Sequence, residues 1–260
     1  FPTSSYDFAE LWPRIEIDFG RVVAPDMIGF GYSAKPPDHP YDLMDQVDLH
    51  EHLLARLRVD EVHVLAHDYG VSVAQELLAR HLRRRSPRLE LASVTLLNGG
   101  LFPETHRARP VQTLLLGPLG PLISRLNDRR RFGRSLAAVF GPRTQPDPAL
   151  LDAFWKLCTH NDGHRIAHRL IRYILDRRRH RERWVDALQT TPVPLRLING
   201  PEDPVSGAHM VSRYRELIPA ADVVSLPGIG HYPQVEAPQA VADAFLAFVQ
   251  PLLQSTGKTR

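Results

Sequence analysis

Five short apolar runs, each ending in a polar or glycine-rich turn, constrain the fold of this chain more than any other feature. Each run has the length of a buried strand and is rich in β-branched residues or leucine. Near-continuous apolar strands that alternate with helical patterns indicate an α/β fold, a mostly parallel sheet flanked by helices. The predicted strands are residues 21–25, 61–66, 91–97, 194–198 and 222–226, and the clearest helical patterns are 43–57, 71–82 and 237–253.

Residues 101–191 interrupt this alternation. The stretch contains no convincing strand, is punctuated by proline, and carries the arginine runs "NDRRRFGR" and "LDRRRHRERW". We interpret it as a helical cap inserted between two parts of an α/β core, residues 1–100 and 192–260. The arginine runs are typical of solvated helix faces rather than of a nucleic-acid groove, because no aromatic residues alternate with them. We therefore expect no nucleic-acid partner.

The composition leaves few other classes of protein open. The chain of 260 residues has a formal net charge of only +3, and Cys158 is its only cysteine, so no disulfide can form within the chain. No apolar run of about 18 residues is present, so we expect no membrane span. These features favour a cytoplasmic protein, although an anchor ahead of Phe1 stays open. They do not specify an oligomeric state.

The short stretch "AHDYG" places a charged residue, Asp68, at the tip of a predicted strand, where a helix begins. Ala66 and Gly70 lie two residues to either side, as in a strand–nucleophile–helix turn whose central serine is replaced by aspartate. An aspartate is already anionic at neutral pH and attacks carbon directly to form an ester. The alternative is that Asp68 only caps the helix.

Two further residues complete a catalytic set. His231 follows the last predicted strand in "GIGHYPQ", and Asp203 follows the preceding strand in "GPEDPV". Nucleophile, acid and histidine occur in the chain order typical of this kind of sheet, and parallel strands bring their carboxyl ends to one edge. Glu202 is the neighbouring alternative acid. Asn98, after the third predicted strand, occupies another place for the acid but is an amide, which favours Asp203.

At this point the sequence resembles the α/β-hydrolase superfamily, in the branch of epoxide hydrolases and haloalkane dehalogenases. The resemblance is carried by the stretches "FPTSSYDF", "GFGYSAKP", "HDYG", "LNGGLFPETHR", "VFGP", "NDG", "GPEDPV" and "HYPQVE". It implies Asp68 as nucleophile, His231 as base, Asp203 as its partner and 101–191 as the cap. It also implies an oxyanion hole from the backbone N–H groups of Phe1 and Tyr69, a cis Pro2, and no cofactor. The resemblance further implies that about three amino-terminal strands of the family fold are absent from this sequence.

The resemblance constrains the substrate less than the chemistry. We expect a small, largely apolar molecule with an epoxide, ester or halide carbon. Dehalogenases of this branch often carry tryptophan where this chain has Tyr69, and epoxide hydrolases use two cap tyrosines where this cap has only Tyr173. We expect Tyr173, Trp155 and Trp184 to bind the substrate. His164 or His168 could assist Tyr173.

Two alternatives stay open. His160, His164 and His168 are spaced by four residues, which could align them for a metal, but Gly163 lies inside the run and no carboxylate is an obvious fourth ligand. We therefore expect no metal site. The second alternative is a protein of this fold that binds or scaffolds without catalysis.

Overall fold

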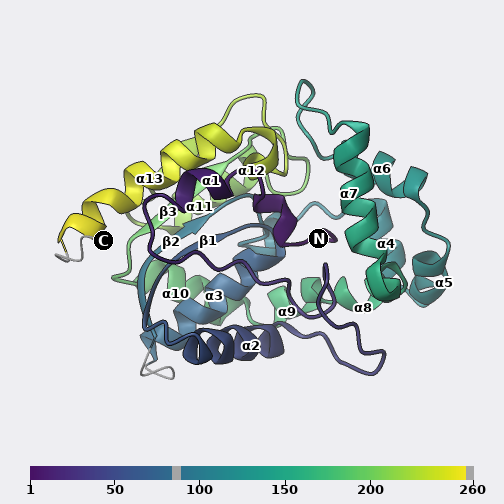
Figure 1. The fold of residues 1–260 in the computed structure, drawn as a ribbon, viewed down its shortest axis with the longest axis horizontal. Helices are drawn as coiled ribbons and strands as arrows, with labels where there is room; N and C mark the ends of the chain where they lie inside the picture. Colours follow the sequence, from purple (N-terminus) through teal and green to yellow (C-terminus); the bar gives the residue numbers. More distant parts are fainter. Residues whose placement is uncertain (84–88, 256–260) are drawn as a thin grey trace.

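The computed structural model describes residues 1–83 and 89–255 (Figure 1). Its centre is a parallel sheet of four strands in the order β1-β2-β3-β4, with Glu61–Ala66, Glu90–Leu96, Leu195–Asn199 and Val223–Ser225. These strands correspond to four of the five predicted runs. The α/β-hydrolase fold class predicted from the sequence is confirmed, because the strands are parallel and helices cover both faces.

Two hydrophobic cores form on the two faces of the sheet. The long helix α13 (Pro238–Ser255) and the short α1 (Trp12–Ile15) cover one face, where Val241 and Phe245 pack with Leu11. The other face is covered by α2 (Leu43–Arg56), α3 (Tyr69–Leu82), α10 (Arg181–Thr190) and α11 (Ala208–Leu217). The remaining short elements of the core are η1 (Ser5–Phe8) and α12 (Pro233–Glu236).

Residues 101–191 form helices without a strand, as the sequence predicts. Figure 1 shows α4 to α8 gathered at one side of the sheet. Helix α10 differs from them, because its buried Trp184 and Leu188 pack in the same core as α3. We keep 101–191 as the proposed cap segment, with α10 as its join to the core. Its other elements are η2 (Pro103–Thr105), α4 (Pro110–Leu116), α5 (Gly120–Arg125), α6 (Arg129–Ala137), α7 (Pro148–Thr159), η3 (His160–Ile166), α8 (Ala167–Leu170) and α9 (Tyr173–Arg179).

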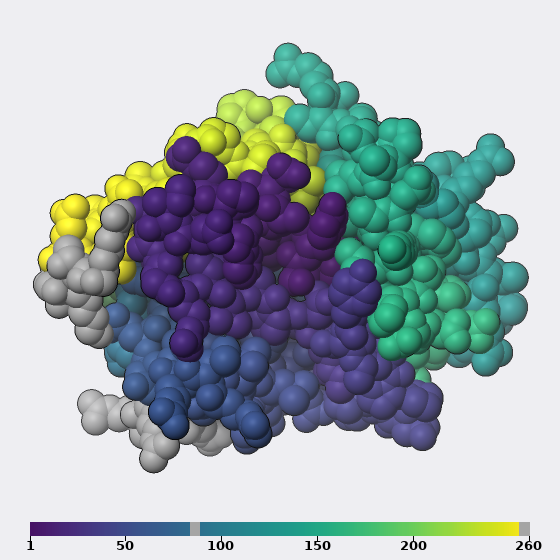
Figure 2. All heavy atoms as spheres, in the orientation of Figure 1, coloured from purple at the N-terminus to yellow at the C-terminus, as the bar shows by residue number. Residues whose placement is uncertain are grey.

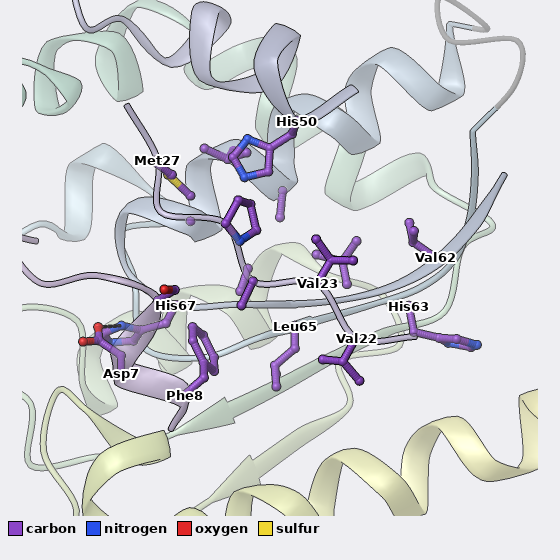
Figure 3. Close-up of a pocket in the computed structure, with 18 of the residues that line it drawn as sticks. Asp7, Phe8, Val22, Val23, Met27, His50, Val62, His63, Leu65 and His67 are labelled. Atoms are coloured by element: carbon purple, nitrogen blue, oxygen red, sulfur yellow. Dashed lines mark ion pairs between the residues drawn. The ribbon is translucent and has the colours of Figure 1, made fainter. Parts of the chain in front are cut away.

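The predicted strand at 21–25 is wrong, because this segment pairs with no strand. A cavity of about 480 Å³ separates it from β1. Val22 and Val23 line the cavity together with Val62 and Leu65 of β1 (Figure 3). An extended segment becomes a strand only when a neighbour supplies ladder hydrogen bonds. Within the described residues β1 pairs only with β2, so its other edge borders this cavity.

The first residues of the chain lie at the surface between α13 and the proposed cap. Figure 2 shows this segment in purple, next to the yellow α13 and the teal helices. Its Phe1–Pro2 peptide is cis, as the resemblance implies. Across residues 1–83 and 89–255, no helix is both long and apolar enough to cross a membrane.

Candidate active site

Asp68 lies at a sharp turn between β1 and α3. Its backbone φ of 41° is in a region that residues with a side chain rarely adopt, so the turn is strained. The Asp68 side chain makes no capping hydrogen bond to α3, which removes the helix cap as the explanation of this buried carboxylate. Gly99 allows the loop after β2 to approach the turn, because an added Cβ would lie 2.8 Å from Val71 and 3.2 Å from the Asp68 carbonyl oxygen.

Asp203 and His231 meet next to this turn. The Nδ1 atom of His231 lies 2.8 Å from Oδ2 of Asp203, and its Nε2 lies 3.7 Å from Oδ2 of Asp68. Ser206 and the amide of Asn98 also donate hydrogen bonds to Oδ2 of Asp203. Glu202 is exposed, so the structure brings together Asp203 rather than Glu202 with the histidine.

Asp203, His231 and Asp68 shift one another's pKa values. Burial alone would raise the pKa of Asp203, but the charge and hydrogen bond of His231, with the Ser206 hydroxyl, lower it to about 2. Burial opposes protonation of His231, yet the carboxylates of Asp203 and Asp68 outweigh it and raise the pKa of His231 to about 10. Both carboxylates are therefore ionised and His231 is protonated at neutral pH.

The nitrogen of Phe1 lies 2.6 Å from Oδ2 of Asp68. Burial favours the neutral acid, but the Phe1 amine, His231 and Arg177 outweigh it and hold the pKa of Asp68 well below its usual range. Tyr69 follows Asp68 directly as the first residue of α3. The structure thus places Phe1, one of the two predicted oxyanion donors, against Asp68, and the other, Tyr69, next to it in the chain.

Arg177 of α9 is a member of the site that the sequence does not reveal. Its buried guanidinium donates from Nη2 to the Asp68 carbonyl oxygen at 2.7 Å and lies 3.4 Å from Oδ1 of Asp68. Its Nε donates to Ser72 Oγ at 2.7 Å. The arginine run "LDRRRHRERW" is therefore not a wholly solvated face. No sequence signal distinguishes Arg177 from the exposed Arg178 beside it.

Comparisons with known proteins show the family of this chain. The profile of the Alpha/beta hydrolase family matches residues 1–244. The chain belongs to the alpha/beta hydrolase family. The mesoderm-specific transcript protein of Mus musculus is 41% identical to this hydrolase over 255 residues, which cover 96% of this chain and 76% of that protein.

Solved structures show the same fold. The haloalkane dehalogenase DbeA from Bradyrhizobium elkani superposes on this hydrolase with a TM-score of 0.80 at 21% identity, covering 98% of this chain and 88% of that chain. The epoxide hydrolase CorEH gives a TM-score of 0.77 at 19% identity, covering 97% of this chain and 89% of that chain. At these identities the likeness concerns the fold alone.

A second polar group supports the histidine loop of this hydrolase. His67 Nε2 lies 2.7 Å from the His231 carbonyl oxygen, which can only accept, so His67 donates there. Its Nδ1 faces Asp7, whose Oδ2 is 3.9 Å away and accepts a hydrogen bond from Thr3. Figure 3 shows Asp7 and His67 side by side at one end of the cavity along β1. Asp68, Asp203 and His231 do not line that cavity, so we do not assign it to the substrate.

The predicted aromatic residues divide into two groups. Tyr173 is buried close to the nucleophile, with its ring 5.1 Å from Tyr69 and 5.9 Å from Phe1. Trp184 instead donates its indole N–H to Glu76 at 2.8 Å, inside the core between α10 and α3. Trp155 contacts Phe132 and His164 within the proposed cap. Only Tyr173 joins the group around Asp68.

The histidines of the cap follow a broken path rather than one helical face. Asn161 and Asp162 have φ values of 49° and 58°, which interrupt the helix between His160 and His164. His168 contacts Ser124 instead. Among residues 1–83 and 89–255, no three His, Cys, Asp or Glu side chains are arranged to hold a metal ion.

Proposed function

We propose that this hydrolase uses Asp68 as a nucleophile and forms a covalent ester with a small, largely apolar substrate. The observation that carries the proposal is the position of the Asp68 carboxylate. It lies on a strained turn, does not cap α3, and faces an imidazole that is held by Asp203. Structures named epoxide hydrolase and haloalkane dehalogenase share the fold, which supports this chemistry.

In the first step, an oxygen of the Asp68 carboxylate bonds to the electrophilic carbon of the substrate. The bond from that carbon to the leaving group breaks, and the leaving group takes the electron pair. A halide departs as an anion, whereas an opening epoxide gives an alkoxide that needs a proton. The protonated His231, whose Nε2 lies 3.7 Å from Oδ2 of Asp68, and the buried Tyr173 are the proposed donors of that proton.

The second step depends on a change of charge. Esterification removes the negative charge of Asp68, one of the two carboxylates that raise the pKa of His231. The pKa of His231 therefore falls, and His231 loses its proton, to the alkoxide or to solvent. Neutral His231 then takes a proton from water as the water oxygen attacks Cγ of Asp68. The N–H groups of Phe1 and Tyr69 stabilise the resulting oxyanion, and its collapse releases the alcohol and restores the carboxylate.

Replacement of Asp68 by asparagine tests this proposal. Asp68→Asn keeps the shape of the side chain but removes the nucleophilic charge, so we expect turnover to fall by at least about a thousandfold. The measurement is initial rates on a panel of epoxides, alkyl halides and esters. Asp243→Asn, on the exposed face of α13, is the matched control and should keep wild-type rates. Unchanged turnover by Asp68→Asn would refute the assignment.

A further inference from the structure

Arg177 adds a buried positive charge that a triad does not require. Asp68, Asp203 and protonated His231 together carry one net negative charge, and Arg177 and the Phe1 amine both lie against Asp68. Relative to the triad, Arg177 is an additional positive charge whether the Phe1 nitrogen is an amine or a peptide nitrogen. A buried charge is costly unless it is paired, so the partner of Arg177 at each stage of the reaction matters.

The guanidinium is fixed before any substrate binds. Ser72 and the Asp68 carbonyl oxygen hold Nε and Nη2, each at 2.7 Å. The ring of Tyr173 lies beneath the guanidinium, with its centroid 4.4 Å from Cζ. Neither of these hydrogen bonds uses Nη1, which lies over Gly100, where an added Cβ would be only 2.5 Å away. Arg177 therefore presents a preorganised donor next to the nucleophile.

We propose that Arg177 forms an anion subsite beside Asp68, and that the preferred substrate carries a carboxylate on or next to the carbon that Asp68 attacks. This inference rests on the proposed function and changes its substrate from a largely apolar molecule to one that carries a negative charge at the reacting carbon. Nη2 of Arg177 lies only 3.4 Å from Oδ1 of Asp68, on the side of the nucleophile. A leaving group departs opposite the attacking oxygen, so Arg177 faces a substituent of the reacting carbon instead.

The change in the charge of Asp68 during the reaction also favours a substrate that carries a carboxylate. When Asp68 becomes an ester, Arg177 loses its anionic partner until hydrolysis restores the carboxylate. A departed halide can diffuse away during that interval, whereas a carboxylate bonded to the alkyl group stays beside Arg177. The substrate carboxylate therefore replaces the charge of Asp68 for the lifetime of the ester.

The first test compares chloroacetate with chloroacetamide, which share the reacting carbon and the chloride but differ in charge. In both, the Asp68 oxygen would replace chloride at the CH₂ group. We expect wild-type enzyme to favour chloroacetate by at least about tenfold in kcat/KM, the effect of one charge-assisted hydrogen bond. Arg177→Met should abolish this preference, Arg177→Lys should retain part of it, and the exposed Arg178→Met should leave it unchanged. Equal rates, or a preference for the amide, overturn the subsite.

The second test measures binding and needs no turnover. Asp68→Asn imitates the neutral ester, so by calorimetry it should bind glycolate about tenfold more tightly than wild type does. The double variant Asp68→Asn/Arg177→Met should lose that gain, and glycolamide should show none. Absence of the gain in folded Asp68→Asn overturns the subsite even if chloroacetamide is hydrolysed. Arg177-dependent binding of glycolate with no hydrolysis of any substrate refutes the proposed function instead and leaves the subsite standing.

Discussion

At the scale of single residues, the pKa values of two buried carboxyl groups, Asp203 and Asp7, shift in opposite directions because their partners differ. Asp203 accepts hydrogen bonds from His231, Ser206, Asn98 and the backbone N–H of Val205, and its pKa is lowered to about 2. Asp7 accepts one from Thr3, while its Oδ1 has no partner among the described residues. Burial therefore outweighs the Thr3 bond and raises the pKa of Asp7 to about 7.

Asp7→Asn should make the protein more stable at high pH. Because its folded-state pKa is raised, Asp7 keeps its proton while the unfolded chain releases one above about pH 4, so Asp7 costs stability as pH rises toward 7. We expect the gain in unfolding free energy to be near zero at pH 4 and up to about 4 kcal/mol at pH 8. Urea unfolding at both values measures it. Asp243→Asn, at an exposed pair with Arg14, should give a small change that does not grow with pH.

His231 should titrate far above an ordinary histidine. Its raised pKa, about 10, means that the stability from its pairing is fully present below about pH 6.5 and is lost as pH rises through 10. Proton-detected NMR of the imidazole should show this transition in wild type. In Asp68→Asn the transition should move to lower pH, because one carboxylate is removed. A value that does not move would contradict the charge change in the second step.

At the scale of elements, α3 connects the site to the rest of the core. The helix begins directly after Asp68, and Glu76, eight residues further along, is a buried residue of the same helix. Glu76 accepts hydrogen bonds from Arg183 and Trp184 of α10 and from Arg80 of α3. These bonds outweigh burial and lower the pKa of Glu76. One carboxylate therefore fixes α10 against the helix that carries the nucleophile turn.

Glu76→Gln should destabilise the fold. Removing the charge leaves Arg80 and Arg183 without their shared buried partner, and we expect a loss of about 3 kcal/mol in unfolding free energy. Glu216→Gln is the matched control, because its solvent-exposed pair with Arg213 should contribute little to stability. Chemical denaturation of both variants measures the difference. Equal losses would show that the buried network does not hold α10.

At the scale of the whole molecule, the sequence predicted what depends on local pattern. Four apolar runs became β1 to β4, because each pairs with a neighbour in the sheet. Asp68, Asp203 and His231 were predicted together because each follows a strand, and parallel strands end at one edge. The strand predicted at 21–25 does not form, and the reason is non-local, because this segment borders a cavity rather than a partner strand.

Contacts between distant segments could not be predicted in the same way. Arg177 meets Asp68 across 109 residues, and nothing in an arginine-rich helix shows which side chain turns inward. Trp184 was expected near the substrate, but Glu76, 108 residues earlier, takes its N–H. Likewise His67 supports the His231 carbonyl from 164 residues away. Such pairs are fixed by packing of the proposed cap and core, which periodicity does not encode.

The most direct test of the central claim follows oxygen from water into the protein. One turnover of excess enzyme in H₂¹⁸O, followed by peptide mass analysis, detects whether water attacks Cγ of Asp68. The account predicts ¹⁸O in the peptide that contains Asp68 and an unlabelled oxygen in the alcohol product of an alkyl halide. Label in the product alone, with none in Asp68, would contradict a covalent ester and show that water attacks the substrate directly.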